Sequence, residues 1–157
     1  MNAECELNAR ASLMNIGREV DYAVRALSYM AGREDNSPTR RSEICVAQDI
    51  PPHYLAKILR KAVAGGLVKS GVGPRGGFWL ARPASEITLL HVYQCINGQL
   101  CLVDCLRDPA ACTFFDVCPQ APVWRGAQEM LLKYLAGFRL AELADREGLT
   151  AMNLRGR

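Results

Sequence analysis

The first apolar pattern along the chain predicts a helix from about Arg18 to Gly32. Its apolar side chains recur every three or four residues and form one stripe, which consists of Val20, Ala23, Val24, Leu27 and Ala31. The polar run at 34–38 ends in proline and breaks this helix. A second, short helix is expected from about Thr39 to Ala47, with Thr39 as its N-cap.

A third helix is predicted from about Pro52 to Ala64, because proline suits a first helical turn and the two glycines at 65 and 66 end a helix. Its inward face is expected to consist of Leu55, Ile58, Leu59 and Ala62. Two short strands, Leu67–Ser70 and Phe78–Ala81, flank a glycine-rich tip and predict a hairpin. This order of elements predicts a winged helix-turn-helix over residues 14–83.

The rest of the chain is expected to be helical around a loop. A connecting helix in 84–98 follows Thr88 and ends near Ile96, and a cysteine-bearing loop occupies 99–119. A longer helix begins near Ala121, within a region that we expect to extend over 120–147. It carries a heptad-like seam, typical of a helix that packs on its own domain or on a second copy, made of Trp124, Ala127, Leu131, Tyr134 and Phe138. The fold class is therefore mostly α with a small β-hairpin wing and a long dimerisation helix.

Composition limits the class of protein to which the chain can belong. The chain has 157 residues, of which half are hydrophobic and 22% are charged, so it can form a real core. No stretch approaches the roughly 20 apolar residues of a membrane helix. Residues 1–13 contain two glutamates and lack the apolar region of a signal peptide. We expect a cytoplasmic protein with no membrane partner, a disordered lead at 1–13 and a flexible tail at 148–157.

The charge of the chain is unevenly distributed. The net charge is +3, but residues 50–85 contain six lysines and arginines and neither aspartate nor glutamate. The rest of the chain therefore carries −3. A basic block of this kind is typical of a polyanion-binding surface, and is also seen on solvated basic faces that bind nothing.

The third helix divides into an apolar and a polar face, as a helix that enters the major groove does. His53 and Tyr54 lie at its N-terminal end, where base edges are usually contacted. Lys57, Arg60 and Lys61 are expected on the outer side, where cations contact phosphates. Arg75 is the cation of the hairpin tip, which suits insertion into a minor groove or a phosphate contact. Each residue alone is also typical of an ordinary core or surface position, and the set as a whole predicts binding to double-stranded DNA.

Seven cysteines are many for a cytoplasmic chain of this size, and four of them fall within 18 residues. These four, Cys101, Cys105, Cys112 and Cys118, follow the spacing C-x3-C-x6-C-x5-C. Thiolates are soft ligands for iron–sulfur clusters and zinc. Because structural zinc sites usually have shorter paired gaps, the spacing favours an iron–sulfur cluster, with zinc or free redox thiols as alternatives.

Together these residues resemble the winged-helix iron–sulfur transcription regulators, a family that includes the cluster-biogenesis repressor IscR and the nitric-oxide sensor NsrR. The resemblance extends from Met14 to about Glu147. Its most specific segments are Asp21–Leu27, Ile50–Leu55, Gly65–Ser70 and Gly73–Phe78, followed by Cys105, Cys112, Cys118 and Trp124.

The resemblance implies a homodimer in which Cys105, Cys112 and Cys118 hold a 2Fe–2S or 4Fe–4S cluster. In the cluster-biogenesis branch a histidine three positions after the last cysteine is the fourth ligand, and Ala121 stands there in this chain. In the nitric-oxide branch an aspartate of the partner subunit's first helix completes the site, and Asp21 matches it. Cys101 is the competing fourth ligand.

A second departure concerns operator choice. Two positions after the recognition-helix tyrosine the family often has a glutamate that discriminates between promoters, and this chain has Ala56. Discrimination of that kind is therefore not expected here.

The leading hypothesis is a repressor that binds operator DNA and responds through its cluster to iron, redox state or nitric oxide. A constitutive or thiol-switched DNA-binding protein with structural zinc or no metal is the alternative. A redox enzyme is a third hypothesis and is disfavoured, because the two histidines, His53 and His91, are far apart in sequence and lack a nucleophile partner.

Overall fold

The computed structural model describes residues 16–144. The expected lead at 1–13 and the expected tail at 148–157 lie outside the described residues. The elements, in chain order, are α1 (Arg18–Ala31), η1 (Glu34–Asn36), α2 (Arg41–Gln48), α3 (Pro52–Ala64), β1 (Val68–Gly71), β2 (Gly77–Leu80), η2 (Ala84–Glu86), α4 (Leu89–Asn97), α5 (Asp104–Arg107), η3 (Pro109–Ala111), η4 (Phe115–Val117), α6 (Ala121–Gly137) and α7 (Leu140–Ala144).

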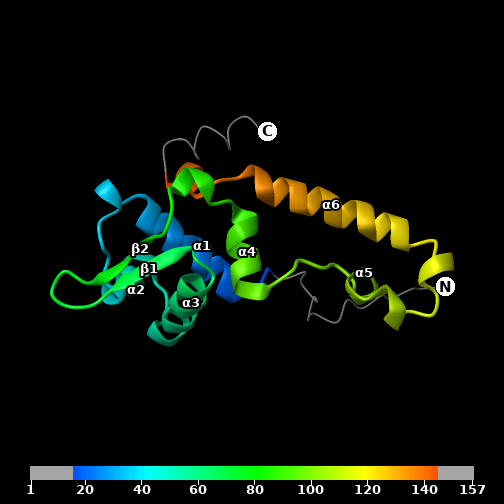
Figure 1. Cartoon of the computed structure of the whole chain (residues 1–157), viewed down its shortest axis with the longest axis horizontal. Coiled ribbons are helices and arrows are strands. Elements are labelled where there is room, and N and C mark those ends of the chain that lie inside the picture. The colour runs from blue at the N-terminus through cyan, green and yellow to red at the C-terminus, as the bar shows by residue number, and fades with distance from the viewer. Residues whose placement is uncertain (1–15, 145–157) are drawn as a thin grey trace, which may run out of the picture.

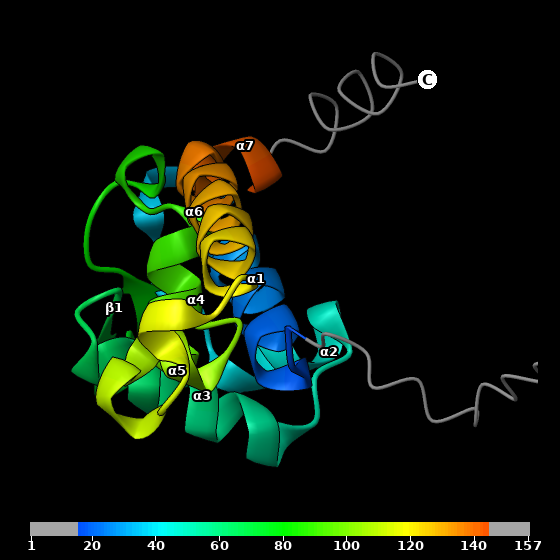
Figure 2. The same cartoon turned by 90° about the vertical axis from the view of Figure 1, so that its right-hand side faces the viewer.

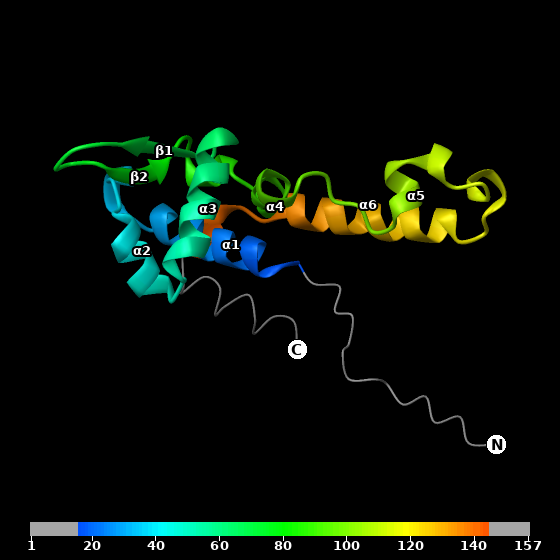
Figure 3. The ribbon, with the colours of Figure 1, turned by 90° about the horizontal axis from the view of Figure 1, so that it is seen from below.

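Three helices and the hairpin form a winged helix-turn-helix at one end of the molecule, which confirms the predicted fold class (Figure 1). Helix α6 extends away from this unit, and α5 lies beside its far end (Figures 1 and 3). Within residues 16–144, none of the helices combines the length and the apolar character that crossing a bilayer requires.

The core lies between α1, α2, α3, α4 and the wing. The predicted stripe of α1 supplies it with Val20, Ala23 and Leu27, and the predicted inward face of α3 is buried throughout. The last short helix closes the core, because α7 packs along α1 and its Leu140 is fully buried. Burial of side chains such as Leu27 and Leu140 contributes about 1.5–3 kcal/mol each.

The segment before α7 is tied to the segment before α4 by backbone hydrogen bonds. The Leu89 N–H donates to the Phe138 carbonyl, and the Leu140 N–H donates to the Ile87 carbonyl. Thr88 and Arg139 form an isolated antiparallel bridge between these two pairs. The chain therefore returns from the far end of α6 and is fixed to the winged helix-turn-helix unit.

The second strand begins and ends one residue earlier than the predicted Phe78–Ala81. Two other predicted boundaries are wrong for reasons of tertiary structure. Thr39 does not cap α2, which begins at Arg41 after Arg40. Thr39 is instead buried and forms a two-way backbone bridge with Phe78, each N–H donating to the other's carbonyl at 2.9 Å. The first strand begins one residue later than predicted, because the Leu67 N–H still donates to Ala62 at the end of α3.

The long helix also ends earlier than predicted. Helix α6 stops at Gly137, and Phe138 is extended with φ −100° and ψ 134°. Phe138 is therefore not part of a helical seam, although its ring lies 4.9 Å from that of Tyr134, measured between centroids. Within the expected region 120–147, the described part consists of α6, a short extended link and α7.

Candidate nucleic-acid interface and cysteine loop

Helix α3 presents one buried and one exposed face, as the sequence predicts. Pro52 is in its first turn and Gly65 caps its end. Leu55, Ile58 and Leu59 are buried against the core. The opposite side is exposed and consists of His53, Lys57 and Arg60. These three residues are spaced by four and three positions, so they share one face of the helix.

The two aromatic residues at the start of α3 have different surroundings. Tyr54 is half-buried, and its ring packs edge-on against Tyr22 of α1 with the centroids 5.5 Å apart. The His53 ring is exposed and tilted against Tyr54 at 4.5 Å. Tyr54 therefore anchors α3 on α1, and His53 is exposed at the start of the helix.

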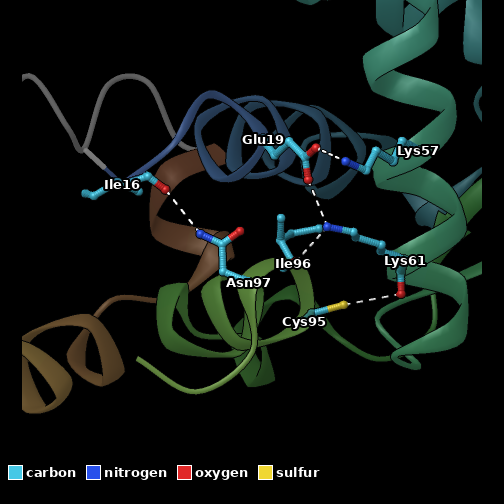
Figure 4. Close-up of polar contacts among 7 residues, drawn as sticks. All are labelled: Ile16, Glu19, Lys57, Lys61, Cys95, Ile96 and Asn97. Carbon is cyan, nitrogen blue, oxygen red and sulfur yellow. Dashed lines mark hydrogen bonds and ion pairs between the residues drawn. The ribbon is translucent and has the colours of Figure 1, made fainter. Parts of the chain in front are cut away.

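The three cations of α3 do not form one outward row. Lys57 and Lys61 both bind the Glu19 carboxylate of α1, and Lys61 Nζ lies 2.8 Å from Glu19 Oε2 (Figure 4). Lys61 Nζ also donates to the Ile96 carbonyl of α4 at 2.8 Å. The expectation that Lys61 faces outward is wrong, because this half-buried side chain ties α3 to α1 and α4.

The electrostatics of this cluster follow from its geometry. The hydrogen bonds from Lys57 and Lys61 hold the pKa of the Glu19 carboxyl below its ordinary value. Arg60, by contrast, is exposed, and its side chain has no hydrogen bond or ion pair to another described residue. Arg60 is therefore the cation of α3 that is most available to a phosphate.

The wing is held rigidly at its base. The Asn36 side chain donates to the Leu80 carbonyl at 2.9 Å and accepts from the Leu80 N–H at 3.0 Å, so it acts like a third strand. A Cβ on Gly77 would lie 2.8 Å from the Thr39 carbonyl oxygen, so this close approach requires glycine. The exposed tip beyond these anchors carries Arg75.

The structure adds two cations that sequence reasoning missed. Arg40 and Arg41 are exposed at the start of α2. Arg41 lines a hollow of about 490 Å³ between α2, α3 and β1, together with Arg60 and Ser70. The sequence feature that could have identified them is the pair of adjacent arginines at the beginning of a predicted helix. This pair lies outside the basic block at 50–85. The hollow brings Arg41 and Arg60 to one surface.

The short helix α5, in the loop that carries the cysteines, lies near the far end of α6 (Figures 1 and 3). Cys105 is in α5, and Cys112 and Cys118 follow η3 and η4. All three thiols are half-buried and free of disulfide bonds. In the part of the chain that the structure describes, no three His, Cys, Asp or Glu side chains gather as a metal site.

Cys101 has a different environment from these three. Its Sγ lies 3.1 Å from the Val103 carbonyl oxygen. It also lines an apolar hollow of about 420 Å³, whose other walls come from α1, α4 and α6 and include Val24, Tyr93 and Leu131. Seen nearly end-on, α6 lies next to α4 (Figure 2).

Asp21 lies in the first turn of α1 with an exposed carboxylate, 3.7 Å from the Arg25 guanidinium. Helices α1 and α5 are at different positions along the long axis of the molecule (Figures 1 and 3). Among the described residues, Asp21 does not gather with two of the loop cysteines into a metal site.

The expected dimerisation face is partly open. Trp124 and Tyr134 of the predicted seam are exposed, and Ala127 and Leu131 are half-buried. Two further apolar side chains of α6, Val123 and Met130, are 67% and 71% exposed. The single chain therefore covers only part of the apolar surface of α6.

A buried helix-turn-helix core, an anchored wing and basic side chains on α2, α3 and the wing tip define a winged-helix transcription regulator. The chain belongs to the Rrf2 family, described as iron-dependent transcriptional regulators, whose profile matches residues 16–146. This finding confirms the resemblance noted in the sequence.

Individual relatives agree with this assignment. An HTH-type transcriptional regulator of Mycobacterium tuberculosis is 37% identical over 90 residues, which are 57% of this chain and 56% of that protein. The chain thus spans about half the length of that relative. The regulator IscR of Klebsiella pneumoniae is 29% identical over 80% of this chain and 77% of its own length.

A solved structure shows the same fold. CymR, the global cysteine regulator of B. subtilis, superposes with a TM-score of 0.68 at 23% identity, over 84% of this chain and 97% of that one.

Proposed function

We propose that this chain is a repressor that binds a double-stranded DNA operator as a homodimer, under the control of an iron–sulfur cluster. The observation that carries the DNA-binding part is the surface formed by His53 and Arg60 of α3, Arg75 of the wing tip and the arginine pair that begins α2. Helix α3 would enter the major groove, and the arginines would contact the flanking phosphates.

For the cluster, the proposed ligands are Cys105, Cys112 and Cys118. Their chemistry fits, since thiolates are the usual ligands of iron–sulfur clusters and these thiols are free and half-buried on one loop. The loop would have to bring the three sulfurs together, because they do not form a metal site among the described residues. A bound cluster supplies a centre that exchanges electrons and reacts with oxidants.

For the dimer, the support is the apolar surface that α6 leaves open at Val123, Met130 and Tyr134. A second copy that covers this surface could bring its own Asp21 to the cluster loop as the fourth ligand. Within one chain α1 and α5, which carries Cys105, are at different positions along the molecule, and this favours the arrangement. Cys101 is the less favoured fourth ligand, because it lines the apolar hollow.

The second candidate is a DNA-binding protein that carries zinc or no metal and is constitutive or switched by its thiols. The separate, free thiols of the loop favour it. Both candidates share the proposed DNA-binding surface and differ in what the cysteines hold and in whether this controls DNA binding.

Purification without oxygen, followed by an absorption spectrum and assays of iron, sulfide and zinc, tests the two candidates. We expect a brown protein whose visible bands and iron are lost in Cys112→Ala and kept in Cys45→Ala, a control thiol on α2 outside the loop. A colourless wild type, with zinc or without metal, would refute cluster control. Bands that persist in Cys112→Ala would refute the proposed ligand set.

A further inference from the structure

Glu19 of α1 is the acidic partner of the recognition helix. Its two carboxylate oxygens accept hydrogen bonds from two lysines of α3, Lys57 at Oε1 and Lys61 at Oε2 (Figure 4). The Glu19 side chain is only 22% exposed, so it is held in place between the helices. The carboxylate therefore neutralises cations of the helix for which we propose DNA binding, and the present inference rests on that proposal.

The two lysines are bound to different degrees. Lys61 has a second acceptor, the Ile96 carbonyl, and its side chain is 34% exposed. Lys57 has Glu19 as its partner among the described residues, and its side chain is 56% exposed. Lys57 can therefore leave Glu19 at the cost of one exposed ion pair, while Lys61 remains fixed to α4.

The position of Lys57 on α3 decides what this weaker attachment means for DNA binding. Lys57 lies between His53 and Arg60 on the exposed face of α3. A DNA backbone that lies along this face would place a phosphate within reach of Lys57. A carboxylate and a phosphate then compete for the same ammonium group.

We propose that Glu19 is an internal competitor of DNA phosphate: it holds Lys57 in the free protein and largely keeps it from a phosphate contact when α3 docks on mixed-sequence DNA. Lys61 keeps its bonds in both states and positions α3. This competition reduces the electrostatic, sequence-independent part of DNA affinity, because it lowers the number of phosphates that α3 neutralises. Glu19 thereby raises the share of affinity that comes from base contacts and acts as a positioning and specificity-determining residue.

Fluorescence anisotropy with a mixed-sequence DNA duplex tests this role, with the affinity measured over a series of salt concentrations. Glu19→Gln removes the charge and keeps an oxygen that can accept from Lys61. We expect this variant to bind about 2- to 5-fold tighter, the range that one exposed ion pair supports. Its plot of log affinity against log salt should be steeper by about one, the value for one additional phosphate contact.

Two further variants separate competition from other effects. Glu86→Gln removes one exposed carboxylate from η2 and controls for the change in net charge. We expect it to leave the salt slope unchanged. Lys57→Gln should reduce the slope by about one in the Glu19→Gln background and by clearly less in the wild-type background.

Circular dichroism confirms that each variant is folded before it is compared. Folded Glu19→Gln with the wild-type slope, or with weaker binding, would overturn the proposal, as would equal effects of Lys57→Gln in both backgrounds. If the wild type shows no salt-dependent DNA binding, the proposed function fails together with this inference. If the wild type binds and only the Glu19 effect is missing, the inference alone fails.

Discussion

The anchor of the wing can be tested at Asn36, whose side chain makes two hydrogen bonds to the backbone of Leu80. Asn36→Gly removes both bonds without adding backbone strain, because φ is 52° at this residue and glycine adopts that conformation freely. Each bond contributes about 0.5–1.5 kcal/mol, so the bonds together account for about 1–3 kcal/mol. The upper half of that range is expected, since Leu80 is 4% exposed and its N–H would lose its partner.

Urea denaturation measures this loss, and hydrogen exchange at the Leu80 amide localises it to the wing. Asp35→Gly is the matched control, because Asp35 has φ 54° and its side chain makes no hydrogen bond to the described part of the wing. It carries the same change in unfolded-state entropy, about 0.4–1 kcal/mol. Equal losses of stability in the two variants, with unchanged exchange at Leu80, would refute the role assigned to Asn36.

Three further outcomes are expected. Leu55→Ala should lower the free energy of unfolding by about 2–5 kcal/mol in urea titrations, because Leu55 is fully buried, and a loss below about 1 kcal/mol would contradict its place in the core. Burial, with smaller contributions from the nearby Arg82 and Arg139, lowers the pKa of His91, whose Nδ1 accepts from the Thr88 N–H, so the folded state favours neutral histidine. The stabilisation that neutral His91 provides should therefore be fully present above pH about 6.5 and decrease as the pH is lowered. His91→Gln, which retains a capping side chain, should reduce this pH dependence of the free energy of unfolding. An unchanged pH profile would contradict the role given to His91. Arg75→Ala should weaken binding to a mixed-sequence duplex and lower the salt slope by about one, whereas an unchanged slope would remove the wing tip from the interface.

Much of the fold could be predicted because its signals are local. Helix α3 has a proline at its start, glycines after its end and apolar residues at helical spacing, and its predicted bounds are those of the structure. The start of α4 after Thr88 is likewise fixed by a capping box with His91, which lies within one helical turn.

The errors have long-range causes. Thr39 has the composition of an N-cap, but its backbone pairs with Phe78, which is 39 positions away. Lys61 lies at the edge of the polar face of α3 and turns inward because Glu19, 42 positions earlier, offers it a carboxylate. Neither pairing leaves a pattern in the local sequence.

In the candidate site, too, local features could be predicted from the sequence and contacts between distant segments could not. The spacing of the cysteines could be read from the sequence, and the structure places Cys105, Cys112 and Cys118 on one loop, with Cys101 in a separate apolar hollow. The contribution of Arg41 could not be predicted, because it depends on the approach of α2 to Arg60 across the hollow beside β1. Which residues share a surface is decided by packing between elements.

The central claim is that the chain recognises a DNA sequence as a dimer and that its cysteine loop controls this binding. Selection from a pool of random-sequence DNA duplexes, performed without oxygen on the protein as purified and after treatment with an iron chelator, tests this claim most directly. The account predicts that one state enriches a motif with two-fold symmetry, with half-sites about one helical turn or a multiple of it apart, and that the other state enriches it less. Enrichment of no motif in either state would contradict sequence-specific DNA binding, and equal enrichment in both states would contradict control by the cluster.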